Sequence, residues 1–358
     1  MIDYADTVIF GPAYLDTVIK VPGPIVPELP FPLDQSLPVK PIFPDNSLTI
    51  RLTSEIGDYL VINLPVNSPD IGGTYNLREA ILSRRCGKDC QPIINTIFAD
   101  ACFQQLGGMG AGYAKATGGL LRMPLGDDSL GNRLCDILFS HGIVSKPAIL
   151  PGHSSDSSLL IQSQTGDKLA VGFRDALINW QPGEDDITMA QGAKYIIFCG
   201  VLNSSMIKIL NCDITAPVMF APAMRNIDDV DCPLADLANK IDYLAMNALE
   251  WSHLHRREEI INAIPLITIT DGARGCDIYL RGKQFFFPAL PHPGSVDTNR
   301  AGETYAATIW KAIFHYCPSF PNAEISEELL THIANLARQQ AHRQLDIIEF
   351  AFPPDDWV

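Results

Sequence analysis

The sequence predicts an α/β protein whose mostly parallel sheet is covered by helices on both faces. Short apolar runs at residues 194–200, 216–222, 241–246 and 266–270 each end in loop residues, and residues 204–210 have helical spacing. Consecutive strand–helix–strand units of this kind align their strands in parallel and pack their helices against the sheet. We therefore expect a three-layer α/β architecture.

Length and composition limit the classes to which the chain can belong. With 358 residues, 47% of them hydrophobic and 19% charged, it can bury a substantial core, either as one large α/β domain with an appendage or as two modest domains. No apolar stretch approaches the ~20 residues of a membrane helix, so we expect no membrane partner. The net charge of −15 repels a phosphate backbone and argues against nucleic acid. The N-terminus lacks the basic flank of a secretory signal, which predicts a cytoplasmic location.

The N-terminal part of the chain predicts a strand followed by a long insertion. Residues 7–11 form a β-branched, apolar run that ends at a Gly-Pro break. Eight prolines within residues 22–44 exclude a helix and predict stiff, extended chain. Residues 48–52 and 59–64 then read as a pair of strands. We expect residues from approximately 20 to 75 to form a proline-rich insertion with a small sheet beside the main domain.

The cysteines predict reduced thiols rather than a disulfide framework. The chain has nine, an odd number, and they are scattered without a Cys-x-x-Cys pair. A metal site formed by Cys86, Cys90 and Cys102 is the alternative interpretation, although no matching fourth ligand lies nearby in the sequence.

The segment with the clearest chemical content lies near the C-terminus. Residues 296–305 read Val-Asp-Thr-Asn-Arg-Ala-Gly-Glu-Thr-Tyr, a turn of small residues that opens a helix and carries Glu303 where that helix begins. A helix start has unpaired backbone N–H groups and the positive end of the helix dipole, so it can hold a phosphate. With a carboxylate available for an attacking hydroxyl, the arrangement suits phosphoryl transfer.

This segment resembles the Asp-Thr-x-Gly-Ala-Gly-Asp signature of the ribokinase-like (PfkB) family of carbohydrate and nucleoside kinases. Arg300 stands at the position of the family's first glycine, and Glu303 stands at the position of its catalytic Asp. The resemblance implies that Glu303 takes the proton of the acceptor hydroxyl, while the N–H groups from Arg300 to Glu303 hold the phosphoryl oxygens. The remaining residues that it places at the transferring phosphate or the nucleotide are Ala301, Gly302, Asp297 and Thr298.

The same resemblance implies a single ribokinase-like domain over residues 1–358, with a β lid, inserted after the first strand, that closes over a sugar. The insertion at residues 20–75 fits that place in the chain. The family's cofactors are ATP and Mg²⁺, and its partners are small-molecule sugars or nucleosides. A homodimer formed through the lid is a further expectation.

Two features resemble the family's substrate-binding elements. Residues 107–112 read Gly-Gly-Met-Gly-Ala-Gly, similar to the family's Gly-Gly-x-Gly-Ala-Asn loop, with Gly112 at the Asn position. We expect a loop here that presents Gly107, Gly108 and Gly112 to the acceptor, because backbone without side chains lets a ligand approach closely. Asp16, shortly after the first strand, stands where the family uses an Asp to bind sugar hydroxyls.

Two alternatives remain open for these glycines. Residues 72–76 also contain a Gly-Gly with an Asn three residues on. The later segment is favoured because residues 126–131, which follow it, resemble the family's Gly-x-Asp-x-x-Gly turn. A dinucleotide-binding turn is the second alternative, but its third glycine would fall at Tyr113, where close helix–strand packing requires glycine.

Two later segments resemble the family's nucleotide-binding elements. Asn247-Ala-Leu-Glu250 matches the Asn-x-x-Glu motif, whose Glu acts on the magnesium and phosphates largely through water. Thr270-Asp-Gly-Ala-Arg-Gly275 resembles the Thr-x-Gly-x-x-Gly loop. A plain turn leading into a β-hairpin is the alternative for the second segment. The resemblance implies nucleotide contacts from Asn247, Glu250, Thr270, Gly272 and Gly275, with Glu250 also near Mg²⁺.

These segments together predict in-line transfer of the ATP γ-phosphoryl group to a primary hydroxyl, with catalysis mainly from positioning and electrostatics. The alternative is a kinase-fold protein that binds ligands or partners with little or no turnover. Arg300 stands where glycine backbone angles are needed, and Glu303 is one methylene longer than Asp, which can displace the carboxylate by ~1 Å.

Overall fold

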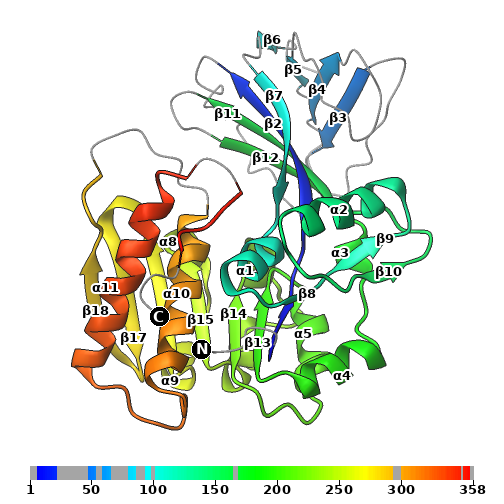
Figure 1. Ribbon diagram of the computed structural model, residues 1–358. Coiled ribbons are helices and arrows are strands. Elements are labelled where there is room, and N and C mark those ends of the chain that lie inside the picture. The colour runs from blue at the N-terminus through cyan, green and yellow to red at the C-terminus, as the bar shows by residue number, and fades with distance from the viewer. Residues whose placement is uncertain are drawn as a thin grey trace.

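The computed structural model describes residues 6–21, 47–53, 59–65, 80–85, 93–97, 101–163, 168–292, 300–347 and 350–354. The strands of the main sheet are β1 (Thr7–Phe10), β8 (Leu120–Arg122), β13 (Tyr195–Cys199), β14 (Val218–Ala221), β15 (Tyr243–Asn247), β16 (Leu266–Asp271), β17 (Gly275–Leu280) and β18 (Lys283–Pro288). Their order across the sheet is β18-β17-β16-β15-β14-β13-β1-β8. Neighbours from β8 to β16 are parallel, whereas β17 and β18 extend the sheet as an antiparallel hairpin. The predicted mostly parallel sheet is confirmed (Figure 1).

Alternate side chains of each strand point to opposite faces of the main sheet, and each face buries its own apolar cluster. On β1, Ile9 packs into one cluster, while Val8 and Phe10 pack into the other. The helices that contribute to the first cluster are α1 (Met109–Thr117), α2 (Ser129–Ser140), α10 (Ala301–Tyr316) and α11 (Glu327–Gln344). Those that contribute to the second are α3 (Ala176–Asn179), α4 (Glu184–Gly192), α5 (Asn203–Leu210), α6 (Met224–Ile227), α7 (Leu234–Leu237), η2 (Ala238–Lys240), α8 (Ala248–His253) and α9 (Arg257–Ala263). Helices on both faces complete the three predicted layers.

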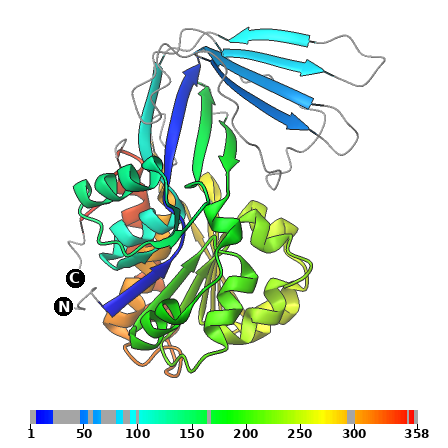
Figure 2. The ribbon, with the colours of Figure 1, turned by 90° about the vertical axis from the view of Figure 1, so that its right-hand side faces the viewer.

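The chain passes directly from the main sheet into a second sheet of four strands. These are β2 (Tyr14–Val21), β7 (Ala101–Gly107), β11 (Ser157–Ser163) and β12 (Lys168–Phe173), in the order β12-β11-β2-β7. β2 is parallel to β11 and antiparallel to β7. Only residues 11–13 separate β1 from β2, and Figure 2 shows β2 rising from the end of β1. The first strand of the main sheet therefore leads straight to the second sheet.

A third sheet contains β3 (Ser47–Thr53), β4 (Tyr59–Pro65), β5 (Ala80–Arg85) and β6 (Ile93–Ile97), each antiparallel to the next. The strand pair predicted at residues 48–52 and 59–64 is confirmed as β3 and β4. Figure 1 shows this sheet at the same end of the molecule as the second sheet. The proline-rich residues 22–44, the alternative glycines at 72–73, and Cys86 and Cys90 lie outside the described residues.

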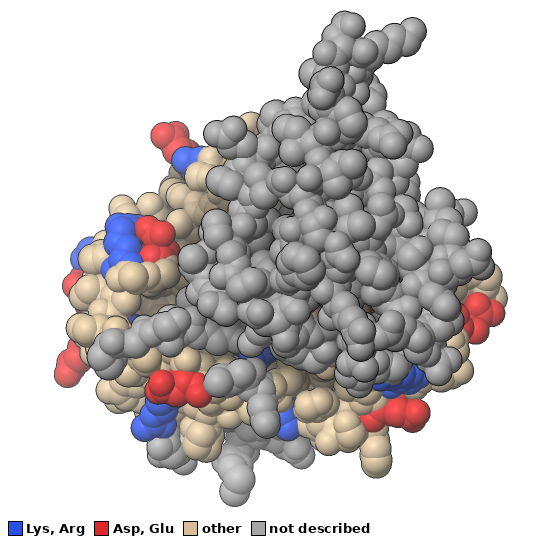
Figure 3. All heavy atoms as spheres, turned by 90° about the horizontal axis from the view of Figure 1, so that it is seen from above, with Lys and Arg blue, Asp and Glu red and all other residues tan. Residues whose placement is uncertain are grey.

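The described residues on one face of the molecule carry charges of both signs (Figure 3). Seen from the end that carries the second sheet, acidic and basic side chains of the described residues neighbour one another around the rim (Figure 3). Of the helices that the structure describes, none combines the length and the apolar character needed to cross a bilayer.

Candidate active site

The carboxyl ends of β1 and β13 lie where the strand order of the main sheet reverses. From β1 the sheet grows to β8 on one side and, through β13, to β16 on the other. A Cβ atom built on Gly11, the residue after β1, would lie 2.3 Å from Sγ of Cys199 and 2.9 Å from Cα of Gly110. The start of α1 therefore packs directly on the ends of both strands. Open α/β sheets bind ligands at such a place.

The glycine-rich segment is a strand end and a helix start, and not the loop that we predicted. β7 ends at Gly107 and α1 begins two residues later, so Gly110 and Gly112 are helical. Gly108 forms the turn with a φ of 95°, and a Cβ there would lie 2.6 Å from the carbonyl oxygen of Pro12. The N–H of Gly110 donates to the same oxygen at 2.9 Å. Close packing against the segment after β1 outweighs the low helix propensity of glycine.

Asp16 lies on β2 beside this turn and is 8% exposed. Its carboxylate fills the space next to Gly107, where an added Cβ would fall 1.9 Å from Oδ2. The hydroxyl of Ser158, on the neighbouring β11, donates a hydrogen bond to Oδ1. Burial raises the pKa of Asp16 to about 6, although Ser158 and the charges of Arg174 and Arg300 act in the opposite direction. Asp16, which we predicted to bind the phosphoryl acceptor, is therefore a buried carboxylate whose pKa is raised by burial and lowered by the charges of two arginines.

The start of α10 brings a second carboxylate to this place. Arg300 precedes the helix in the left-handed conformation, with a φ of 64°, and its carbonyl accepts from the N–H of Thr304 at 2.8 Å. Glu303 is half-buried, and its Cγ lies 3.7 Å from the Cβ position of Gly112 on α1. Burial raises the pKa of Glu303, while its own N–H and Arg300 lower it. No described atom lies within 4 Å of the Cβ position of Gly302, so this turn of the helix faces open space.

The other residues of the C-terminal segment are only partly described. Ala301 is the first residue of α10 and is half-buried. Asp297 and Thr298 lie outside the described residues.

The Asn-x-x-Glu segment starts α8 at the carboxyl end of β15. Oδ1 of Asn247 accepts from the N–H of Glu250, and Oε2 of Glu250 accepts from the N–H of Asn247, both at 2.8 Å. This reciprocal capping fixes the two side chains. Burial, with the negative charge of Glu303 as a further contribution, raises the pKa of Glu250 to about 7. The charge of Glu303, at the start of α10, therefore acts on Glu250, at the start of α8.

The Thr-x-Gly-x-x-Gly segment lies beside the Asn-x-x-Glu segment. Thr270 pairs with Asn247 in the parallel register of β15 and β16. Gly272 opens the short helix η3 (Gly272–Arg274) with a φ of 47°, and no described atom lies within 4 Å of its Cβ position. Gly275 has a φ of 125°, and a Cβ there would lie 2.2 Å from the carbonyl oxygen of Phe287. The β17–β18 hairpin therefore requires Gly275, while Gly272 leaves free space.

Four charged side chains from distant parts of the chain act on one another at this end of the sheet. The charge of Arg300 lowers the pKa of both Asp16 and Glu303, and the charge of Glu303 raises that of Glu250. Ser158, which sequence reasoning missed, lies 142 residues from its partner Asp16. Only strand pairing brings them together. A helix N-terminus with a half-buried carboxylate and an arginine can hold an oxyanion and accept a proton.

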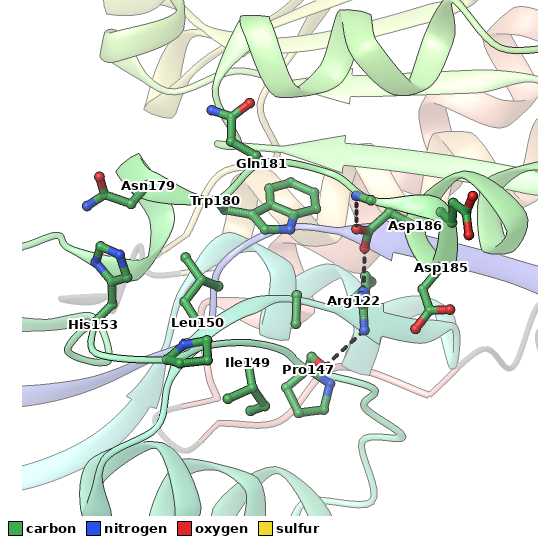
Figure 4. A pocket seen from close by; sticks show the side chains of 14 residues that line it. Arg122, Pro147, Ile149, Leu150, His153, Asn179, Trp180, Gln181, Asp185 and Asp186 are labelled. Carbon is green, nitrogen blue, oxygen red and sulfur yellow. Dashed lines mark hydrogen bonds and ion pairs between the residues drawn. The ribbon is translucent and has the colours of Figure 1, made fainter.

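A separate pocket of about 690 Å³ lies near the pair of strands β9 (Pro124–Gly126) and β10 (Ala148–Leu150), and its lining includes none of the site residues above (Figure 4). Nε of Arg122 donates to Oδ1 of Asp186 at 2.5 Å, and the other oxygen of Asp186 accepts from the N–H of Gly183 at 2.8 Å. The same guanidinium donates to the carbonyls of Lys146 and Pro147. These contacts tie β8 to the start of α4, so the buried ion pair has a structural role.

We expect Gly107→Ala to destabilise the protein and Gly112→Ala to be tolerated. The new methyl group at Gly107 would overlap the carboxylate of Asp16, whereas at Gly112 its nearest neighbours are 3.7 and 3.9 Å away. Overpacking costs about 1–3 kcal/mol, while alanine in a helix gains up to about 1 kcal/mol over glycine. Urea unfolding of both variants measures the difference. Equal stability of the two would contradict this account of Gly107.

Comparison with known proteins adds independent information. The model of the pfkB family carbohydrate kinases matches residues 107–329. Ribokinase from Giardia lamblia matches with a TM-score of 0.63 at 13% identity, covering 97% of this chain and 95% of that one. Arabidopsis thaliana ribokinase, complexed with ribose and ATP, has a TM-score of 0.59 at 16% identity, covering 97% and 94%. Burkholderia thailandensis nucleoside kinase, in complex with inosine, has a TM-score of 0.60 at 14% identity, covering 96% and 92%. No curated protein matches the sequence.

The family match and the structural matches agree with each other. The matched residues run from Gly107, beside Asp16, through Glu303 at the start of α10, and they include more than half of the chain. The solved structures share the three-layer arrangement over nearly the whole length of this chain. The chain therefore belongs to the pfkB family of carbohydrate kinases and has the ribokinase-like fold.

Proposed function

We propose that this protein transfers the γ-phosphoryl group of ATP to a primary hydroxyl of a small polyhydroxylated acceptor, a sugar or a nucleoside. Membership of the pfkB family supports phosphoryl transfer to a carbohydrate-like acceptor. The fold is shared with a ribokinase complexed with ribose and ATP and with a nucleoside kinase in complex with inosine. These matches favour a kinase over the alternative of a binding protein without turnover.

One observation carries the proposal: Asp16 and Glu303 both border the segment 107–112. Oδ2 of Asp16 lies 1.9 Å from the Cβ position of Gly107, and Cγ of Glu303 lies 3.7 Å from that of Gly112. Asp16 comes from the second sheet and Glu303 from the first turn of α10. Asp16 would accept hydrogen bonds from the hydroxyls of the substrate, and Glu303, which lies near it, would take the proton of the attacking hydroxyl. A site that binds and deprotonates one alcohol needs both groups.

The residues present fit a nucleotide and a magnesium ion. The positions of Gly302 and Gly272 open onto free space, which leaves room for phosphates near exposed N–H groups. The negative charge of Glu303 contributes to the raised pKa of Glu250, and oxygen donors of this kind suit Mg²⁺. In the proposal Glu250 holds the metal through water, and Asn247, Thr270, Asp297 and Thr298 contact the nucleotide. Bound Mg-ATP supplies the phosphoryl group and charge neutralisation.

The residues of the chain would divide the work as follows. Asp16 binds acceptor hydroxyls, while Gly107 and Gly108 bring bare backbone close to the acceptor. Glu303 removes the proton from the attacking hydroxyl. The N–H groups at the start of α10, from Arg300 to Glu303, hold the phosphoryl oxygens at the positive end of the helix dipole.

We extend the proposal to a single domain over residues 1–358, with residues 20–75 as an insertion that contributes a lid over the acceptor and a homodimer interface. The position of β2 is an argument for the lid, because β2 carries Asp16 and also belongs to the second sheet. Sedimentation of the full chain at micromolar concentration measures the dimer, and a monomer there would count against that part of the proposal.

The proposal is tested by measuring ADP release with Mg-ATP across a panel of sugars, nucleosides and related alcohols. A thermal-shift titration with ATP, ADP and a non-hydrolysable analogue measures nucleotide binding in parallel. Turnover with at least one acceptor, together with stabilisation by ATP, supports a kinase. Stabilisation by NAD or NADP without any by ATP would falsify the proposal.

We expect Arg300→Gly to move the acidic limb of the pH–rate profile to higher pH. Arg300 lowers the pKa of Glu303, so its removal raises that pKa, and a higher pH is needed to ionise the base. The backbone tolerates the change, because glycine adopts a φ of 64° without strain. Initial rates of ADP release from pH 5.5 to 9 measure the shift. An unchanged profile would show that Arg300 does not tune Glu303.

A further inference from the structure

Two arginines lie beside the acceptor side of the site and take no part in the proposed phosphoryl transfer. Arg174 follows β12, and its Cζ lies 3.6 Å from the ring centroid of Tyr14. Its Nη1 also donates to the carbonyl of Ser157 at 2.5 Å. Tyr14 and Asp16 are two residues apart on β2, so their side chains point to the same face of the second sheet. Arg174 therefore faces the space beside Asp16.

Arg225 approaches the same tyrosine from the main sheet. It lies on α6, directly after the carboxyl end of β14. A Cβ built on Gly200 would lie 3.9 Å from Cβ of Ala223 and 3.8 Å from Cδ of Pro12, so the start of α6 and the segment that leads into β2 both lie beside Gly200. The charge of Arg225 acts on the hydroxyl of Tyr14. Two guanidinium groups thus act on Tyr14, that of Arg174 over the ring and that of Arg225 at the hydroxyl.

Neither arginine has an acidic partner at ion-pair distance in the part of the chain that the structure describes. Both are half-buried. Two acids lie near enough for these charges to act on them. Asp16 accepts from Ser158, and Oδ1 of Asp156 accepts from the N–H groups of Asp175 and Leu177. Oδ2 of Asp156 is buried without a hydrogen-bond partner among the described residues. Burial raises the pKa of this carboxyl, and the charges of both arginines lower it.

Two positive charges near one tyrosine repel each other, and the repulsion is stronger out of bulk water. The hydroxyl of Tyr14 is buried, its proton has no acceptor among the described residues, and Arg225 lies near enough to donate to its oxygen. An oxyanion bound between the guanidinium groups would relieve the repulsion and accept hydrogen bonds from both arginines and the tyrosine.

We propose that the acceptor carries an acidic group, a carboxylate or a phosphate, which Arg174, Arg225 and the hydroxyl of Tyr14 bind, while Asp16 holds a hydroxyl further along the same molecule. This inference rests on the proposed function, because it names the class of acceptor for that site. The substrates are sugar acids or sugar phosphates in preference to neutral sugars.

Calorimetric titration of the full chain with matched pairs of ligands tests the inference. The pairs are D-glucose with D-gluconate, D-ribose with D-ribonate, and D-fructose with D-fructose 6-phosphate, each with and without a non-hydrolysable ATP analogue and Mg²⁺. We expect at least one acid to bind about 10- to 100-fold more tightly than its neutral counterpart, as for hydrogen bonds between charged groups. The pair that shows the difference distinguishes carboxylate from phosphate. Equal or weaker binding of all three acids overturns the inference.

Variants of Arg225 give the second arm of the test. Arg225→Gln is expected to weaken binding of the acid at least 10-fold more than binding of its neutral counterpart. Arg225→Lys keeps the charge but loses the planar fork, so its affinity for the acid is expected to lie between those of the unchanged protein and Arg225→Gln. Lys208→Gln, an exposed change of equal charge on α5, is the control. An equal loss of affinity for the acid and for its neutral counterpart, in a variant with an unchanged melting temperature, overturns the inference.

The outcomes separate this inference from the proposed function. Tight binding of an acid without ADP release supports the acidic acceptor and counts against phosphoryl transfer. ADP release with neutral acceptors alone supports phosphoryl transfer and overturns the acidic acceptor.

Discussion

Replacement of Glu303 by Gln is expected to lower the rate of ADP release by about 10²- to 10⁴-fold, the range for loss of a general base. The amide has nearly the same shape but cannot take the proton of the acceptor hydroxyl. Initial rates at saturating ATP and acceptor measure the loss. Glu303→Asp keeps the carboxylate and is expected to retain or increase the rate.

Two controls test whether the lower rate of Glu303→Gln is caused by loss of the base and not by a general effect on the protein. The carboxylate of Glu303 is held in surroundings that raise its pKa, so a neutral side chain there does not lower stability at neutral pH, and the melting temperature is expected to stay the same or rise. Glu328→Gln, an exposed change in the first turn of α11, is the matched variant and is expected to leave the rate unchanged. Undiminished turnover by Glu303→Gln would remove Glu303 as the base.

The second large effect is expected from Asp16→Ala, which should weaken acceptor binding by about 10²-fold and leave ATP binding nearly unchanged. The carboxylate can accept from two hydroxyls, and each hydrogen bond to a charged group contributes about 1.5–3 kcal/mol. Calorimetric titrations with the best acceptor and with ATP measure the two affinities separately.

Asp16→Asn and Asp185→Ala complete this comparison. Asp16→Asn keeps the shape beside Gly107 and the contact with Ser158, so the fold is retained while the charge is lost. Asp185 is exposed on α4, and its removal is expected to change neither affinity. If Asp16→Ala in a folded protein weakens ATP and acceptor binding equally, Asp16 is a structural residue and does not bind the acceptor.

Local sequence signals gave the order of the elements correctly because their causes are local. The run at residues 194–200 forms β13, and the run at residues 266–270 forms β16. Ser326, a residue type favoured at helix starts, caps the last long helix, and its Oγ accepts from the N–H of Leu329 at 3.1 Å. Such signals depend on side chains within one turn or one strand, so they can be read without a fold.

The glycine segment shows where local signals fail. Four glycines within residues 107–112 predict a loop, because glycine disfavours a helix by about 1 kcal/mol per residue. In the structure the second half of the segment is helical, since α1 can approach β1 closely only without side chains at Gly110. Packing supplied by a segment about a hundred residues away decided the outcome.

The sequence by itself determined the fold class, the family and the identity of most candidate site residues, since each rests on residues close together in the chain. Only the tertiary structure decided which of them meet. Strand register pairs Asp16 with Ser158, and the packing of α10 on α1 sets Glu303 against Gly112. Arg174, which no motif marks, reaches the site because β12 ends beside Tyr14. Contacts between distant segments depend on how whole elements pack, and that information is not contained in any short stretch of sequence.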